Sequence, residues 1–258
     1  AWERIVDIEK SPKHVVNVAV IGKYIELQDA YKSLYEAIRH GAIANDSKAV
    51  IKGIHSESLR PDNINDELAG FDAIVIPGGF GERGIDGKLL ACQFGRENQV
   101  PTLGICLGMQ CMVIEFARNV CDLGEAHSTE FREDSPDPVI SLLEEQKGVQ
   151  DIGGTMRLGA NDVVLSPDSL VHRAYQKDTI TERHRHRYEF NNSYRETFSS
   201  KGLKVTGIYK DKDLVEIIEI SGHPWYVGVQ FHPEFLSKPV AVHPLFQSLI
   251  ASAIDKNK

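Results

Sequence analysis

Residues 101–110 read PTLGICLGMQ and join a short apolar run to a segment with helical character. The apolar run predicts a buried strand, and a helix is expected from Leu107 to about Arg118. The pattern G-x-C-x-G spans the junction at residues 104–108. Small residues are needed on both sides of so sharp a turn, because larger ones would clash with the backbone. The stretch therefore predicts an α/β fold with Cys106 at the carboxyl end of a central strand, where open sheets place their sites.

Upstream of this stretch, apolar runs alternate with segments of helical spacing. Strands are expected at residues 16–24, 49–54, 71–77 and 101–105, and helices from Gln28 to His40, with Gly41 as a stop, and over roughly 86–98. Strands that alternate with helices at this spacing form βαβ units, which predicts a parallel sheet with right-handed crossovers.

Downstream, the chain changes to short strands with few helices between them. These strands are expected in VVLS (163–166), ERHRHRYEF (182–190), LKVTGIYK (203–210), LVEIIEI (214–220) and WYVGVQF (225–231), and an amphipathic helix over roughly 243–255. Short strands in succession favour antiparallel pairing. We predict one α/β domain whose central sheet is open, mostly parallel, flanked by helices and extended by antiparallel strands.

Composition and charge narrow the class of protein. The chain has 258 residues, of which 41% are hydrophobic and 26% are charged, as is typical of a soluble globular domain. Its formal net charge of -8 argues against nucleic acid as a partner, because phosphate binding depends on clustered Lys and Arg. No apolar run is long enough to span a membrane, and no signal peptide opens the chain, so we expect a cytoplasmic protein without a membrane partner.

The cysteines and the first residues carry two further expectations. The cysteines are Cys92, Cys106, Cys111 and Cys121. They show neither a C-x-x-C pair nor the spacing of a disulfide framework, so we interpret them as reduced thiols. The chain begins with Ala1 rather than Met, as expected for a piece of a longer polypeptide or after N-terminal processing. We predict a linker remnant over residues 1–15 and a single domain over residues 16–258.

Cys106 is the candidate nucleophile. The helix that follows begins at this cysteine, and its N-terminal field favours thiolate over thiol. The backbone N–H of Leu107 is then free to bind the oxyanion of a tetrahedral intermediate, and the flexible loop at residues 78–81, GGFG, is suited to donating a second N–H. For the motif alone, the competing interpretation is a buried structural cysteine flanked by glycines.

A base for this thiol appears much later, in residues 228–234, GVQFHPE. A thiolate needs an imidazole with which to exchange protons, and the imidazole needs a partner that fixes its tautomer. On extended backbone His232 and Glu234 would point to the same side, although Pro233 disturbs this geometry. We predict a triad of Cys106, His232 and Glu234, with a turn histidine before a proline as the competing interpretation.

Three blocks resemble the signatures of class I glutamine amidotransferases: PGGFG (77–81), GICLGMQ (104–110) and GVQFHPE (228–234). Longer motifs resemble the glutaminase domain of CTP synthase: GGFGERG (78–84), STEF (128–131), GGTMRLG (153–159) and ERHRHRYE (182–189). The resemblance extends from about Val16 onward. It implies a flavodoxin-like fold and the hydrolysis of L-glutamine to glutamate and ammonia through a γ-glutamyl thioester on Cys106.

The resemblance also implies roles for further residues. The implied substrate-binding residues are Phe80, Gly108, Met109, Gln110, Glu130, Arg187 and Tyr188. Of these, Gln110 and Glu130 would hold the α-amino end of glutamine, and Arg187 would hold its α-carboxylate through two parallel hydrogen bonds. The N–H groups of Gly79 and Leu107 would form the oxyanion hole, and the side chain of Leu107 would help to shape the pocket.

A partner domain is implied as well. In CTP synthases the ammonia passes to an amidoligase (synthetase) domain that uses ATP and Mg to aminate UTP, and GTP stimulates glutamine hydrolysis from the domain interface. Arg83 is the residue we would connect to GTP, with a solvated loop arginine as an equal alternative. Nothing here resembles the amidoligase domain, so we expect no CTP formation and at most weak glutaminase activity. We expect no cofactor and no metal in this domain, and homotetramers and filaments of the full-length protein.

Other interpretations of these stretches are open. Residues 183–187, RHRHR, are a candidate basic patch for phosphate or RNA, which the net charge disfavours. His184 and His186 share a face of a strand and are candidate metal ligands, but no third ligand has evident spacing, so structural roles are favoured. A different thiol hydrolase on this scaffold, such as a γ-glutamyl hydrolase or a peptidase, and a non-catalytic interaction or filament-forming module are the alternative functions.

Overall fold

The main sheet of the molecule contains nine strands in the order β2-β1-β3-β4-β12-β11-β10-β7-β8. The computed structural model describes residues 2–27, 29–142 and 156–256. The strands are β1 His14–Gly22, β2 Ser47–His55, β3 Ala73–Ile76, β4 Thr102–Ile105, β7 Arg157–Leu165, β8 Thr179–His186, β10 Leu203–Tyr209, β11 Leu214–Ile220 and β12 Tyr226–Val229. From β2 to β12 all neighbours are parallel, and from β12 to β8 all are antiparallel. The predicted fold class is confirmed.

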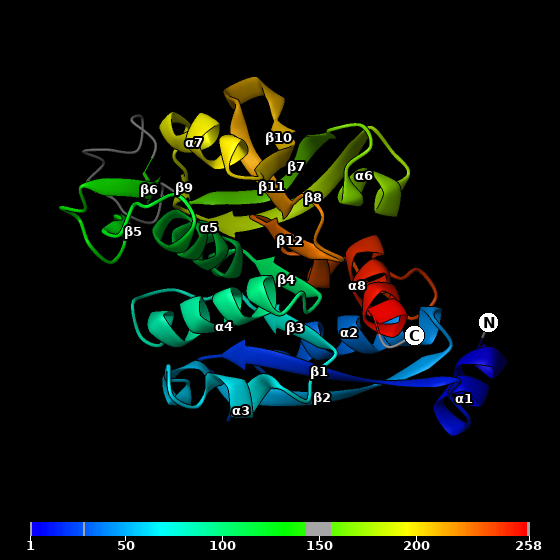
Figure 1. Cartoon of the computed structure of the whole chain (residues 1–258). Helices are drawn as coiled ribbons and strands as arrows, with labels where there is room; N and C mark the ends of the chain where they lie inside the picture. Colours follow the sequence, from blue (N-terminus) through cyan, green and yellow to red (C-terminus); the bar gives the residue numbers. More distant parts are fainter. Residues whose placement is uncertain (1, 28, 143–155, 257–258) are drawn as a thin grey trace.

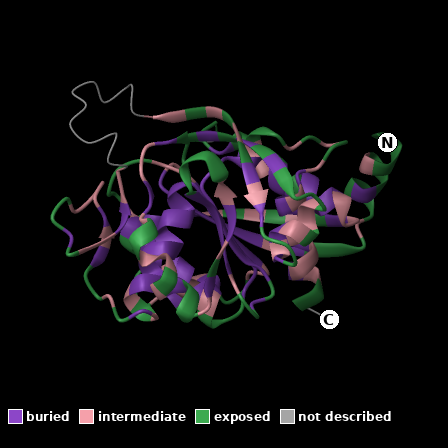
Figure 2. Ribbon diagram, turned by 90° about the horizontal axis from the view of Figure 1, so that it is seen from above, coloured by how far each residue is buried: buried purple, intermediate pink, exposed green. Residues whose placement is uncertain are grey.

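Helices cover both faces of this sheet (Figure 1). On one face lie α3 Ile64–Leu68, α4 Ile85–Glu97 and α5 Leu107–Asn119, and on the other α2 Lys32–Ala44, α6 Leu170–Tyr175 and α8 Pro244–Lys256. The remaining helices are α1 Trp2–Lys10, α7 Arg195–Ser200 and the 3-10 helices η1 Ser56–Ser58, η4 Asn192–Tyr194, η5 Lys210–Lys212 and η6 Pro233–Phe235. Because both faces are covered, β3, β4 and β12 are buried at every residue, which explains their continuous apolar sequences. Figure 2 shows the buried residues gathered in these strands and on the inner sides of the helices.

A second, three-stranded sheet was not expected from the sequence. It consists of β5 Ala126–Ser128, β6 Asp137–Ser141 and β9 Glu189–Phe190. The prediction of one strand over residues 182–190 is wrong, because β8 ends at His186 and β9 pairs with β6. The chain passes from one sheet to the other between these strands, so Arg187 and Tyr188 lie in the connection.

The prediction that Gly41 ends its helix is also wrong. Helix α2 continues through Gly41 to Ala44. A methyl group at Gly41 would lie 2.5 Å from the main-chain oxygen of Phe246 in α8, so the glycine permits the two helices to pack closely. Residue 28, where the helix was expected to begin, lies outside the described residues.

The β7–β8 ribbon extends well beyond the rest of the sheet. β7 pairs with β8 from Arg157 to Val164, but it pairs with β10 only at Val164 and Leu165. The first half of β7 and the second half of β8 are therefore free to lie near other elements, and they approach the candidate active site described below. Residues 153–155 of the GGTMRLG motif lie outside the described residues.

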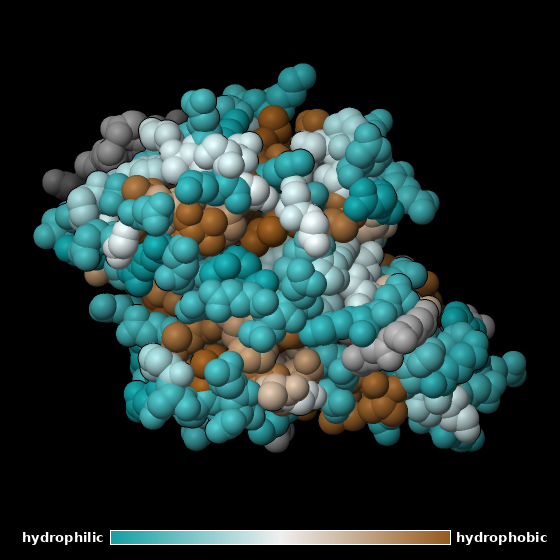
Figure 3. Space-filling model, in the orientation of Figure 1, coloured by the Kyte–Doolittle hydropathy of each residue, from teal (hydrophilic) through white to brown (hydrophobic). Residues whose placement is uncertain are grey.

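The segment that was expected to be a linker contains α1. Arg4 in this helix pairs with Asp46 at 2.8 Å, and β1 already begins at His14. The division of the chain at residue 15 stays a prediction. In the described part of the chain, no helix is both long and apolar enough to cross a membrane. Hydrophilic side chains cover much of the face in Figure 3, with hydrophobic ones in smaller patches between them.

Candidate active site

Cys106 lies between β4 and α5 in a backbone conformation that few residues adopt. Its φ is 54° and its ψ is -108°, outside the regions where an L-residue is relaxed. The surrounding glycines explain how the turn fits. A methyl group at Gly108 would lie 1.9 Å from the carbonyl oxygen of Ile76, and one at Gly104 would lie 2.5 Å from Met112 Sδ. The strained turn and the glycines therefore match the elbow expected from the sequence.

His232 and Glu234 meet through a turn rather than along a strand. β12 ends at Val229, and Pro233 begins the 3-10 helix η6. The turn brings Nδ1 of His232 to 2.8 Å from Oε1 of Glu234. Because Nδ1 has this carboxylate partner, Nε2 is the nitrogen left to face another group, and it has no hydrogen-bond partner among the described residues.

The imidazole of His232 lies close to Cys106. A methyl group built on Gly78 would be 3.0 Å from Cε1 of His232 and 3.4 Å from Cβ of Cys106, so the three residues surround one small space. Burial disfavours the imidazolium, but Cys106 and Glu234 outweigh this effect and raise the pKa of His232 to about 10. The arrangement therefore favours a protonated His232 beside the sulfur at neutral pH.

Strand β8 completes the surroundings of these residues. The main-chain N–H of His232 donates to the carbonyl oxygen of Arg183 at 2.8 Å. The thiol of Cys106 donates to the carbonyl oxygen of Arg185 at 3.9 Å. The ribbon that leaves the main sheet thus supplies main-chain contacts to both members of the pair.

The two predicted oxyanion-hole residues are neighbours. A methyl group at Gly79 would lie 3.5 Å from Cδ2 of Leu107. Leu107 is the first residue of α5, and in the described part of the chain neither its N–H nor that of Gly79 has a main-chain acceptor. Helix N-termini present such free donors, and these two can point at one oxygen atom.

Two cavities lie on either side of this centre. One of about 310 Å³ is lined by Cys106, His232, Glu234, residues 77–80 and a set that sequence reasoning missed. The missed residues are Tyr24, Ala30, Tyr31, Ser33, Leu34, Arg185 and Phe235. The second, of about 1040 Å³, is lined by Glu130 and Tyr188 among others. Tyr24 follows β1 on the edge that carries the site, and that position was the available sequence signal.

The predicted substrate-binding residues fall into two groups. Glu130 accepts a hydrogen bond from the N–H of Gly81 at 2.9 Å, and Gln110 donates to the carbonyl oxygen of Tyr188 at 3.1 Å, so these residues connect the loop, α5 and the β8–β9 connection. Burial raises the pKa of Glu130, an effect opposed by the Gly81 N–H and by the charges of Lys23 and Arg187.

The second group does not reach either cavity through a side chain. Met109 is fully buried in the hydrophobic core, and Gly108 packs against Ile76. Phe80 behaves differently, because it lines the smaller cavity and is 48% exposed. Any contact of Gly108 or Met109 with a substrate would therefore involve the main chain.

Arg83 lies near the loop but is engaged elsewhere. Its Nη1 is 2.9 Å from Oε2 of Glu57, and its guanidinium lies 5.8 Å from the ring centroid of Tyr24. Both members of the ion pair are about half exposed. A connection of Arg83 with GTP stays a prediction.

Two buried lysines near the loop were not recognised from the sequence. Lys88 in α4 donates to the carbonyl oxygen of Pro77 at 2.7 Å. Lys23, after β1, donates to the carbonyl oxygen of Phe80 at 2.9 Å and also to that of Gly81. Buried lysines are rare, but nothing in the sequence around either one marks it as buried, since both positions would suit exposed residues.

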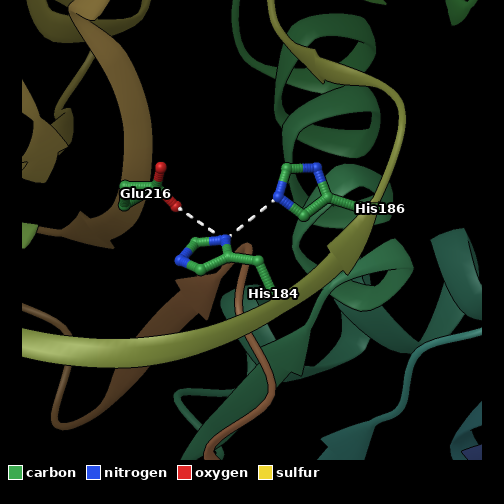
Figure 4. Close-up of side chains that lie close together, drawn as sticks. All are labelled: His184, His186 and Glu216. Atoms are coloured by element: carbon green, nitrogen blue, oxygen red, sulfur yellow. Dashed lines mark hydrogen bonds and ion pairs between the residues drawn. The ribbon is translucent and has the colours of Figure 1, made fainter. Parts of the chain in front are cut away.

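The structure supplies the third neighbour that His184 and His186 lacked. One nitrogen of each histidine and one oxygen of Glu216 lie within 4.8 Å of one another (Figure 4). His184 Nδ1 is 3.1 Å from His186 Nε2 and 3.5 Å from Glu216 Oε2. However, Arg157 hydrogen-bonds Glu216 and thereby places a positive charge beside these donors. We interpret the group as a hydrogen-bonded network and assign no metal to it.

The network also bears on the RHRHR stretch. Burial, together with the charge of Arg157, lowers the pKa of His186 to about 3, so this imidazole is neutral. Arg183 and Arg185 point outward while His184 and His186 are buried, which is the alternation of a strand with one covered face. The histidines therefore belong to the interior, in agreement with the structural role favoured for them.

Comparisons with known proteins agree with this geometry. Residues 26–252 match the family described as "Glutamine amidotransferase class-I". CTP synthases from Geobacter metallireducens and Aquifex aeolicus are 53% and 54% identical to this chain over 98% of it. The chain spans about half the length of these relatives, 47% in each case.

A solved structure is similar over nearly its whole length. The glutaminase domain of Trypanosoma brucei CTPS, solved with bound acivicin, superimposes with a TM-score of 0.87 at 36% identity. The match covers 93% of this chain and 94% of that domain. The chain therefore belongs to the class-I glutamine amidotransferase family and, within it, to the glutaminase domains of the CTP synthase type.

Proposed function

We propose that this chain hydrolyses L-glutamine to glutamate and ammonia, with Cys106 as nucleophile. The observation that carries the proposal is the arrangement of Cys106, His232 and Glu234. A cysteine in a strained turn lies beside an imidazole whose far nitrogen is 2.8 Å from a carboxylate. These are the parts that thiol-dependent acyl transfer requires.

In the first stage, the Cys106 thiolate attacks the side-chain amide carbon of glutamine. A C–S bond forms, and the carbonyl electrons move to the oxygen, where the N–H groups of Gly79 and Leu107 stabilise the negative charge. The C–N bond then breaks as His232 donates its proton to the leaving nitrogen. Ammonia departs, and a γ-glutamyl thioester remains on Cys106.

In the second stage, neutral His232 takes a proton from a water molecule as the water oxygen adds to the thioester carbon. The C–S bond breaks, glutamate leaves, and the thiolate and imidazolium are restored. Glu234 keeps Nδ1 of His232 protonated throughout, so that Nε2 makes every exchange. The cycle consumes glutamine and water and uses only side chains and N–H groups of the chain.

The substrate's amino-acid end would lie toward the larger cavity. Glu130 and Tyr188 line it, and the charge of Arg187 acts on Glu130, so a carboxylate and a guanidinium are available side by side. Glu130 would bind the α-amino group and Arg187 the α-carboxylate, while Gln110 supports Tyr188 from below. This pairing favours a free amino acid over the peptide of a peptidase.

In the complete protein the ammonia would serve to aminate UTP to CTP. This part of the proposal is supported by the relatives named CTP synthase, of which the chain spans 47%. The synthetase domain, with ATP, Mg and UTP, would be the partner of this one, and GTP would act through the interface near Arg83. Assembly into homotetramers and filaments would belong to the full-length protein.

A covalent glutamine analogue tests the proposal directly. The 258-residue chain would be incubated with 6-diazo-5-oxo-norleucine, and the modified residue would be identified by mass spectrometry. We expect one adduct on Cys106, protection by glutamine, and no adduct in Cys106→Ser. Labelling of Cys92, Cys111 or Cys121 in place of Cys106 would contradict the assignment.

A further inference from the structure

The loop at residues 77–81 is fastened at both ends by buried side chains. Lys88 donates to the carbonyl oxygen of Pro77 at 2.7 Å, at the start of the loop. Lys23 donates to the carbonyl oxygens of Phe80, at 2.9 Å, and of Gly81, at its end. We propose that these two lysines are positioning residues that hold the N–H of Gly79 in place for the oxyanion; this inference rests on the proposed function.

The peptide unit between Phe80 and Gly81 is held on both of its edges. Its carbonyl oxygen accepts from Lys23, and its N–H donates to Oε1 of Glu130 at 2.9 Å. A peptide unit is planar, so two hydrogen bonds on opposite edges determine its orientation. Glu130 thereby contributes to the loop as well as to the larger cavity.

The peptide unit between Pro77 and Gly78 is held by Lys88 in the same way. Fixing the direction of the carbonyl oxygen also fixes the direction of the Gly78 N–H on the opposite edge. Only the two peptide units around Gly79 are left between the fastened ones. Gly78 and Gly79 carry no side chains that could restrict their backbone, so the two lysines restrict a segment that would otherwise have wide freedom.

Lys88 is an unusual residue to bury. Its side chain is completely enclosed, and among the described residues no carboxylate forms an ion pair with it. Burial lowers the pKa of Lys88 to about 8, against the opposing effects of Cys111, Cys92 and Cys106. Enclosing an unpaired ammonium is costly unless it is hydrogen-bonded, and its observed partner is the carbonyl oxygen of Pro77. The cost is consistent with a role at this loop.

Both ammonium groups also act on the charge of the reaction. They lie on the far side of the loop from the oxyanion position, and a cation bound to a carbonyl oxygen polarises the peptide unit behind it. Negative charge appears on the substrate oxygen only in the tetrahedral intermediate. Removing a lysine should therefore weaken binding of species with that oxygen more than it affects the reactivity of the free thiol.

The test compares two reagents for Cys106 on the full 258-residue chain. An aldehyde analogue of glutamine forms a hemithioacetal, in which the thiol sulfur bonds the aldehyde carbon and the aldehyde oxygen occupies the oxyanion position. Iodoacetamide alkylates the same sulfur by displacing iodide and places no oxyanion in the hole. The variants are Lys23→Met and Lys88→Met, with Lys23→Arg as the conservative variant and the exposed Lys204→Met as control.

We expect the aldehyde dissociation constant to rise by roughly 100-fold in Lys23→Met and by about tenfold in Lys88→Met. The rate of iodoacetamide alkylation should stay within about threefold, Lys23→Arg should recover most of the affinity, and Lys204→Met should match the wild type. Thermal unfolding of each variant shows whether it folds; if Lys88→Met does not, the two Lys23 variants decide.

Three results would overturn the inference. They are wild-type aldehyde affinity in Lys23→Met and in every folded Lys88 variant, an equal loss of alkylation rate and aldehyde affinity, and no recovery in Lys23→Arg. Failure of the wild-type chain to bind the aldehyde or to react at Cys106 would instead contradict the proposed function, so the two failures are distinguishable.

Discussion

The main-chain N–H of His232 donates to the carbonyl oxygen of Arg183 at 2.8 Å, although their strands are far apart in the main sheet. His232 follows β12 in the middle of the sheet, and Arg183 lies in β8 at its edge. The contact is possible because most of the β7–β8 ribbon extends beyond β10. The ribbon lies over the carboxyl ends of the central strands, and there it also receives the Cys106 thiol at the carbonyl oxygen of Arg185.

Glu234→Ala should slow glutamine hydrolysis by roughly 100-fold or more, because Nδ1 of His232 loses the partner that fixes its tautomer. Loss of the carboxylate should also lower the pKa of His232 from about 10, since Glu234 helps to raise it. Ammonia release and an NMR titration of the imidazole measure the two effects. The exposed Glu196→Ala serves as control. An unchanged titration curve in Glu234→Ala would show that the carboxylate does not act on the imidazole.

Gly108→Ala should destabilise the fold by about 3 kcal/mol or more, because the new methyl group would lie 1.9 Å from the carbonyl oxygen of Ile76. Gly124→Ala is the matched control, since a methyl group there has no atom within 4 Å. Its effect should remain within about 0.5 kcal/mol. Urea unfolding provides both values, and equal free energies for the two variants would refute the close approach of α5 to β3.

The free energy of unfolding should fall as pH rises from about 5 to 8, in part because of Glu189. Burial and the nearby Glu216 raise the pKa of Glu189 to about 8, from an ordinary value of 4.5, despite Arg157. Between these values the folded chain keeps a proton that the unfolded chain has released, so its stability decreases with rising pH. Glu189→Gln should reduce this decrease by roughly 2 kcal/mol.

Urea unfolding of the wild type and Glu189→Gln at pH 5 and pH 8 measures that difference. The exposed Glu196→Gln should keep the wild-type decrease. If Glu189→Gln lost as much stability as the wild type between the two pH values, Glu189 would be ionised throughout, and Arg157 would be its dominant neighbour.

Arg187→Lys should raise the KM for glutamine by roughly tenfold or more, with kcat changed less than about threefold. The reason is that an ammonium cannot form the two parallel hydrogen bonds of a guanidinium with the α-carboxylate. Steady-state ammonia release measures both constants, and the exposed Arg173→Lys is the control. A fall in kcat at constant KM would move Arg187 from substrate binding to the chemical step.

Local sequence patterns were sufficient for most of the fold. The apolar runs at β1, β3 and β4 and the glycines around Cys106 act over a few residues, so spacing alone indicates them. The order of Cys106, His232 and Glu234 in the chain could also be recognised, because each follows a predicted strand. The same patterns failed at Gly41, where the deciding contact is with Phe246 of α8.

The sequence by itself therefore determined the strand-to-helix turn at Cys106, the class of sheet and the family, since these depend on short-range backbone geometry and on motifs. The tertiary structure decided which distant groups meet at that turn. Lys23 and Lys88 at the loop, Glu216 beside His184 and the carbonyl of Arg183 at His232 come from different segments of the chain. Their partners depend on strand order and on the course of the β7–β8 ribbon, and no local pattern encodes either of these.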